Sequence, residues 1–228
     1  MELLNVQKAR SVWLFDSNDL NPRGRSIGTD LFEWIKARYH FEKVPSSVSD
    51  LDKTKALHFG NGKFRVREDG STGQPLGEDV TVELRVYNDG IVGDTRSSSK
   101  DTDAFLADVL DSATREFGLS YTPALIRRKL YVSELNVRMG ASMMLLNPKL
   151  DEFTAHLRGA LGSNSPTELA GLAFWPDVVP KPDQFVFRLE RKWGFAFSEQ
   201  RYLAIASLQT ERHIELLSEL EQMLSSYD

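Results

Sequence analysis

The chain has 228 residues, of which 41% are hydrophobic and 27% are charged, so it is long enough to bury a sizeable core in one large or two small domains. Its 28 basic and 33 acidic residues give a formal net charge of −5, which argues against general attraction to nucleic acid or an anionic membrane. The absence of cysteine excludes disulfides and cysteine-ligated metals, and the apolar runs are too short to span a membrane, so we expect a cytoplasmic protein.

Apolar spacing predicts five elements in the first half of the chain: a strand (12–15), a helix (29–41), a hairpin (57–66), a long strand (80–87, which could extend to 95) and a helix (101–118). The hairpin is predicted because Asn61 and Gly62 can adopt the positive φ angles of a tight turn. Gly118 stands where a helix C-cap is expected.

The second half is predicted to contain a strand (130–139), a helix (149–162), a strand (171–175), long strands (185–208) and a helix (210–226). Asn147 and Pro148 are typical residues for the start of the helix that follows them. The buried stripe of that helix is predicted to consist of four residues: Leu150, Phe153, Leu157 and Leu161.

Each half reads as strand, helix, several antiparallel strands and helix. This pattern predicts an α+β fold of two similar halves, 1–119 and 129–228, joined by a connector, 120–128. We expect a mostly antiparallel sheet with the helices packed on one face. A single continuous domain is the alternative.

The segment from Asn88 to Leu119 begins with many Asp, Gly, Ser and Thr residues. Four acids, Asp89, Asp94, Asp101 and Asp103, could in principle surround a hard cation. Their order does not fit an EF-hand loop, whereas a turn at 88–90 followed by a helix cap at Ser98, Ser99, Asp101 or Thr102 accounts for every residue. We therefore predict turn and cap, and no metal site.

Two arginines, Arg23 and Arg25, precede the predicted helix 29–41. A helix N-terminus and arginine side chains both favour an anion, so these residues are candidates for binding an anion or an acidic partner. The glycine and lysine patterns of phosphate and dinucleotide loops are absent. The alternative is that both arginines are ordinary surface residues.

Strand parity places Glu134 on the same face as Leu130 and Val132, and Arg191 on the same face as Leu189. A charge that points toward apolar surroundings needs a partner, so Glu134 and Arg191 could form an internal pair or line a pocket. Bulges, or a position at the rim of the sheet, would explain them without a site.

The sequence lacks short catalytic motifs. The four histidines, His40, His58, His156 and His213, have no metal-binding spacing, and no GxSxG motif occurs. We interpret His213 as a surface or packing residue rather than a general base.

Two connections carry large apolar residues. One contains Trp175, Val178 and Val179 among three prolines, and the other contains Met139, Met143, Met144, Leu145 and Leu146. Such segments either cover the core or form an adaptable contact surface. We favour core cover.

These observations predict a non-catalytic protein-binding module of the inhibitor, immunity or assembly-factor type. It would bind a protein partner, for which the acidic charge favours a basic one, or itself, without cofactor, metal, nucleic acid or membrane. The predicted binding residues are Arg23, Arg25, Glu134, Trp175 and Arg191. The alternative is a hydrolase whose acids and arginines meet at the junction of the halves.

Overall fold

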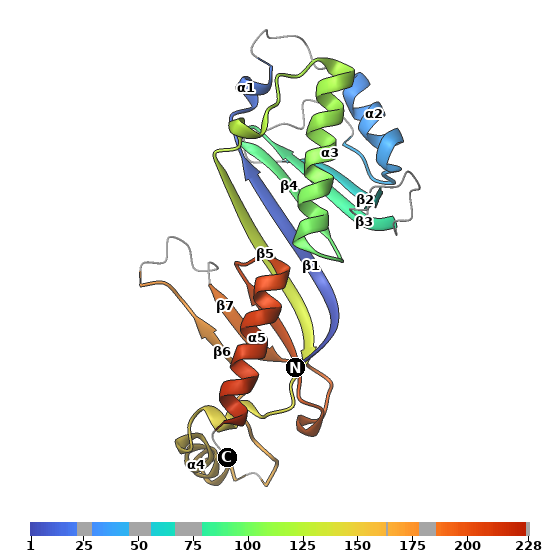
Figure 1. Ribbon diagram of the computed structural model, residues 1–228. Coiled ribbons are helices and arrows are strands. Elements are labelled where there is room, and N and C mark those ends of the chain that lie inside the picture. The colour runs from blue at the N-terminus through green and yellow to red at the C-terminus, as the bar shows by residue number, and fades with distance from the viewer. Residues whose placement is uncertain (22–28, 46–55, 67–78, 163, 178–185, 227–228) are drawn as a thin grey trace, which may run out of the picture. The chain divides into compact units, whose positions relative to one another are not determined.

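The computed structural model describes residues 1–21, 29–45, 56–66, 79–162, 164–177 and 186–226 (Figure 1). The strands are β1 (Glu2–Leu14), β2 (Leu57–Arg65), β3 (Asp79–Tyr87), β4 (Gly90–Thr95), β5 (Arg128–Arg138), β6 (Gly171–Phe174), β7 (Phe187–Arg191) and β8 (Arg201–Ala206). The α-helices are α1 (Ser17–Leu20), α2 (Thr29–Tyr39), α3 (Ser99–Phe117), α4 (Lys149–Leu161) and α5 (Thr210–Ser225). Among these described residues, no helix combines the length and the apolar character needed to cross a membrane.

The predicted α+β class is confirmed. The sheet has eight strands in the order β2-β3-β4-β1-β5-β8-β7-β6, and it is mostly antiparallel. Apart from the four-residue α1, strand, helix, three strands and helix occur twice along the chain. Read outward from the centre of the sheet, the two sets of strands follow the same order, β1-β4-β3-β2 and β5-β8-β7-β6, which is consistent with two similar halves.

The chain packs as two compact units. The N-terminal unit is Lys8–Val132, and the C-terminal unit consists of Met1–Gln7 and Ser133–Asp228. The first strand is much longer than the predicted 12–15, because its residues before Ser11 continue the alternation of more and less exposed side chains. The division into 1–119 and 129–228 stays a prediction about the repeat.

The N-terminal unit buries one face of its strands against α2 and α3. On β1 the odd-numbered residues Ala9, Ser11 and Trp13 are buried, whereas the even-numbered residues are half-exposed. The predicted caps of α3 are confirmed: the Ser98 hydroxyl accepts the N–H of Asp101, and Gly118 has a φ of 67°. The spacing of apolar residues in β1 and α3 therefore matches the face that each element buries.

The hairpin predicted over 57–66 is wrong. These residues form the single strand β2, which pairs with β3 through a bulge between Phe59 and Gly62. Asn61 does adopt a positive φ, of 55°, but within the bulge. A Cβ on residue 62 would lie within 3.0 Å of three ring carbons of Phe41, so glycine is required here for a close approach of the ring.

The C-terminal unit has a separate core under α5. It includes Leu135, Leu189, Tyr202 and Leu217, together with Met139 and Met143 from the connection after β5. Core cover is therefore confirmed for Met139 and Met143. It is wrong for Leu145, Leu146 and Trp175, which are 38%, 43% and 51% exposed. Val178 and Val179 of the other connection lie outside the described residues.

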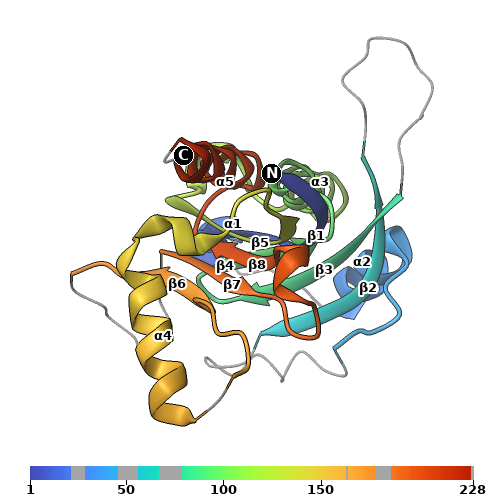
Figure 2. The same cartoon turned by 90° about the horizontal axis from the view of Figure 1, so that it is seen from below.

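The predicted burial of the α4 stripe is wrong. Phe153 and Leu161 are 63% and 66% exposed, Leu150 and Leu157 are half-buried, and Thr154 is the helix residue that is buried. Figure 2 shows α4 extending away from the strands of its unit. The pattern indicated an amphipathic helix correctly, but such a pattern does not specify what covers the apolar side.

Candidate functional site

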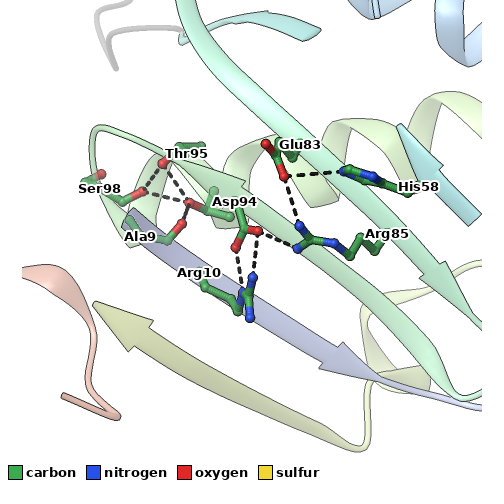
Figure 3. A network of polar contacts seen from close by, with 9 residues as sticks. Ala9, Arg10, His58, Glu83, Arg85, Asp94, Thr95 and Ser98 are labelled. Atoms are coloured by element: carbon green, nitrogen blue, oxygen red, sulfur yellow. Dashed lines mark hydrogen bonds and ion pairs between the residues drawn. The ribbon is translucent and has the colours of Figure 1, made fainter. Parts of the chain in front are cut away.

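A charged network lies on the half-exposed side of the N-terminal unit's strands (Figure 3). Arg10 on β1 and Asp94 on β4 face each other in register, and the Arg10 Nε and Nη2 atoms donate to Asp94 Oδ1 and Oδ2 at 2.7 and 2.9 Å. Arg85 on β3 donates from Nη1 to Asp94 Oδ2 at 2.6 Å. The two guanidinium groups hold one carboxylate, whose side chain is 8% exposed.

The electrostatic balance of this network keeps Asp94 ionised. Burial by itself would raise the pKa of Asp94, but hydrogen bonds and charges from Arg10 and Arg85 outweigh it and lower the pKa below its usual value. Arg85 also donates to Glu83 at 3.0 Å, and Glu83 lies 3.4 Å from His58 Nε2. A carboxylate with a lowered pKa is a poor proton donor at neutral pH. Because Asp94 bonds to arginines on two neighbouring strands, the network instead links β1, β4 and β3.

The acids considered as cation ligands belong to different clusters. Asp103 accepts hydrogen bonds from Trp13 Nε1 at 2.9 Å and from the Tyr131 hydroxyl at 3.0 Å, while Asp94 is held by its two arginines. Asp101 lies in the first turn of α3. Within the described residues, no group of three His, Asp or Glu side chains is placed to hold a metal ion. Asp94 and Asp103 therefore make ion pairs and hydrogen bonds within the chain, and Asp101 occupies an ordinary first-turn position.

Glu134 and Arg191 do not form an internal pair, which was one of the possibilities left open by strand parity. Glu134 lies opposite Ile205 and Arg191 lies opposite Tyr202 on β8, so their side chains point to opposite faces. Arg191 forms an ion pair with Glu168, and its guanidinium stacks 4.6 Å from the ring centre of Phe197. Its side chain is 10% exposed, which leaves little of it available to a partner.

Arg23 and Arg25 lie outside the described residues, so their predicted role as anion-binding residues stays a prediction.

His213 is a packing residue, which is one of the two roles predicted from the sequence; the other was a surface residue. Its side chain is fully buried, its Nδ1 atom contacts the Ser133 hydroxyl, and its ring lies 5.9 Å from that of Phe187. Burial lowers the pKa of His213 to about 4. Nε2 has no hydrogen-bond partner in the part of the chain that the structure describes. The ring is therefore neutral at physiological pH.

The exposed apolar residues gather in the C-terminal unit. Of twelve large apolar side chains that are exposed among the described residues, Leu130 alone belongs to the N-terminal unit. The others are Leu3, Leu145, Leu146, Phe153, Leu161, Phe174, Trp175, Val186, Trp193, Phe195 and Met223. Single exposed apolar residues are normal, so the finding here is the uneven distribution of such residues between the two units.

Three of these residues are neighbours at one end of the β6–β7 pair. Phe174, Trp175 and Val186 are 60%, 51% and 47% exposed, and the Val186 N–H donates to the Phe174 carbonyl at 3.0 Å. We call Phe174, Trp175 and Val186 the apolar tip. Sequence reasoning singled out Trp175 but missed the other two, because their strand pattern is also that of a buried pair.

The formal charge is also distributed unevenly between the two units. The C-terminal unit contains 14 acidic and 9 basic residues, a net charge of −5, whereas the N-terminal unit contains 19 of each. The apolar tip therefore belongs to the acidic unit of the protein.

No family model matches the sequence, and a comparison with curated proteins finds no match. Among solved structures, the chain is similar to Methanococcus jannaschii TBP, with a TM-score of 0.41 and 13% sequence identity over 99% of this chain and 98% of that chain. At that level of similarity, the comparison supports no conclusion about what this chain binds.

Proposed function

We propose that the chain is a non-catalytic protein-binding module whose C-terminal unit binds a basic protein at the apolar tip. The observation that carries this proposal is the exposure of Phe174, Trp175 and Val186 at one end of the β6–β7 pair in the acidic unit. Tryptophan is enriched among the residues that dominate binding energy, because it removes a large rigid surface from water. Trp175 is thus the central binding residue of the proposal.

The charge of the C-terminal unit supports a basic partner. With a net charge of −5 on the unit that carries the tip, a partner bearing lysines and arginines would be attracted before contact, and the apolar side chains would then provide the short-range affinity. Salt screens such attraction beyond a distance of about 8 Å at physiological ionic strength. The association rate should therefore fall as salt is added, while dissociation changes less.

The ion pairs are a reason to prefer binding over hydrolysis. Asp94 is held by two guanidiniums, and Arg191 by Glu168, so these groups are committed to partners within the chain. A general acid or base needs a pKa near the working pH, and the pKa of Asp94 is lowered away from it.

The test is affinity purification from the native cell with three baits: the wild type, Trp175→Ala and Trp193→Ala. The captured protein is quantified by mass spectrometry, and its affinity for each bait is then measured with the purified partner. Trp193 is the matched control, because it is 96% exposed in the same unit but lies in the turn after β7.

We expect one basic protein to be recovered in stoichiometric amount by the wild type and by Trp193→Ala. Trp175→Ala should bind it at least about tenfold more weakly, as for the loss of a residue at the centre of an interface. Equal binding by all three baits, a stronger effect of Trp193→Ala, or an acidic partner would contradict the proposal.

A further inference from the structure

A pocket of about 390 Å³ lies within the C-terminal unit, on the face of its strands opposite the core. Asn136 on β5 is directly opposite Leu203 on β8, which is directly opposite Glu190 on β7. Because Leu135 and Leu189, their neighbours along the strands, are buried in the core, this row projects from the other face of the sheet. We call this the Trp193 pocket, and its lining includes Gln7, Asn136, Glu190, Lys192, Trp193 and Leu203.

Contacts within the unit hold the polar groups of the Trp193 pocket in place. Lys192 Nζ donates to Asn136 Oδ1 at 3.0 Å, and Asn136 Nδ2 donates to Asn5 Oδ1 at 2.7 Å. Glu190 forms an ion pair with Arg188 on the same strand. An ammonium has three N–H donors and a carboxylate has several acceptor positions, so Lys192 and Glu190 keep bonding capacity for a ligand. Groups that are already ordered lower the entropic cost of binding.

Trp193 forms the aromatic side of the pocket. It stands in the turn after β7 and is 96% exposed. An indole with this exposure buries little apolar surface and therefore contributes little to the stability of the fold. A ligand that covers one face of the ring gains that burial without displacing any part of the unit.

The charges of the pocket favour a neutral ligand. Glu190 would repel an anion and Lys192 would repel a cation, because both charges line the same small pocket. A hydroxyl both donates and accepts, so several hydroxyls on one ring match a mixture of amide, ammonium and carboxylate groups. The C–H groups on one face of a sugar ring are apolar, and they suit the electron-rich face of an indole.

We propose that the Trp193 pocket binds a neutral sugar of one or two rings, with one ring stacked on Trp193 and its hydroxyls bonded to Lys192 and Glu190. The pocket is near the lower end of the range for small ligands, roughly 300–1,000 Å³. For a hexose, with about 12 non-hydrogen atoms, we expect a dissociation constant on the order of 0.1–1 mM. The inference does not depend on the proposed protein partner, because the apolar tip lies at the other end of β7.

Nuclear magnetic resonance titration of the purified, isotope-labelled chain tests the proposal. The probes are the neutral sugars D-glucose, D-galactose, D-mannose, N-acetyl-D-glucosamine, cellobiose, lactose and maltose. The chain has four tryptophans, and the indole N–H signal of Trp193 is identified by its absence from the spectrum of Trp193→Phe. At least one neutral sugar should shift this signal in a saturable way. The charged analogues D-glucuronate and D-glucosamine should bind more weakly than that sugar.

Variants assign the binding to the pocket, with the side-chain amide signal of Asn136 as the readout. Trp193→Ala should raise the dissociation constant of the sugar at least about tenfold, and Trp193→Phe should restore most of the affinity, because the sugar contacts the ring face. Lys192→Met should also weaken binding, since it removes the donor and keeps the apolar stem. Trp175→Ala is the matched control: it removes an exposed tryptophan of the same unit outside the pocket lining and should bind the sugar like the wild type.

Adenosine and uridine are titrated in parallel, because a nucleobase also stacks on an indole. Binding of a nucleoside without binding of any sugar would overturn the proposal. So would the absence of a saturable shift with every neutral sugar, tighter binding of a charged analogue, or an unchanged affinity in Trp193→Ala. None of these results bears on the capture of a protein by the apolar tip, which Trp193→Ala is expected to retain.

Discussion

Arg10 and Asp94 face each other across strands β1 and β4, and the guanidinium of Arg10 donates to both carboxylate oxygens, at 2.7 and 2.9 Å. Arg85 adds a third hydrogen bond at 2.6 Å, so one carboxylate joins three strands. Because Asp94 is buried and both arginines are partly exposed, the loss of the carboxylate should be costly, but less so than for a fully buried pair.

We expect Asp94→Asn to lower the free energy of unfolding by about 2 kcal/mol at pH 7, since two arginines lose a charged partner. The pKa of Asp94 is lower in the folded chain, so its contribution is complete above the ordinary value of about 3.9 and is lost as the pH falls through the folded value. Urea unfolding at neutral and acid pH checks this. The exposed pair of Arg65 and Asp79 provides the control Asp79→Asn, which should change stability much less.

His213 should make the protein less stable as the pH falls from about 6.5 to about 4. The folded chain keeps the ring neutral, whereas the unfolded chain binds a proton below its ordinary pKa, so protonation favours unfolding in this window. The loss should reach roughly 3 kcal/mol at the acid end. His213→Leu should flatten this slope, and His156→Leu should not, because that ring is exposed. Equal slopes in the wild type and His213→Leu would contradict the assignment.

Gly62→Ala should destabilise the N-terminal unit by about 1–3 kcal/mol, because the added Cβ would clash with the buried ring of Phe41. Gly159→Ala is the matched control. Nothing lies within 4 Å of a Cβ at that position, and alanine favours a helix, so stability should stay the same or rise by up to about 1 kcal/mol. Thermal or urea unfolding of both variants distinguishes a steric requirement from a general effect of removing glycine.

The two helix N-termini at Ser98 and Gln209 should respond in opposite directions. Ser98→Ala removes the hydroxyl that accepts the Asp101 N–H at 3.1 Å, so it should cost about 1 kcal/mol. Gln209 occupies the N-cap of α5 without a side-chain cap bond, so Gln209→Ser should gain up to about 1 kcal/mol. Equilibrium unfolding checks both values, and a neutral Ser98→Ala would show that the cap bond is not needed.

Strand parity predicted part of the environment of Arg191. The alternation of β7 correctly placed its guanidinium on the side of Leu189, and a charge in that position has to find a partner. Glu134 was one candidate for that partner, but the partner is Glu168, which comes from the irregular segment before β6. Parity specifies a face, and it does not specify which loop residue reaches that face.

Local pattern by itself determined the α+β class, the extents of α3 and α5, and the caps Ser98 and Gly118, because periodicity and capping depend on neighbours a few residues away. Tertiary structure decided three things: that Asn61 and Gly62 form a bulge against Phe41, that Asp94 lies between two arginines, and that Phe153 and Leu161 of α4 stay exposed. Each of these depends on residues distant in the sequence that meet through packing. The pattern of one segment contains no information about which distant residues those are.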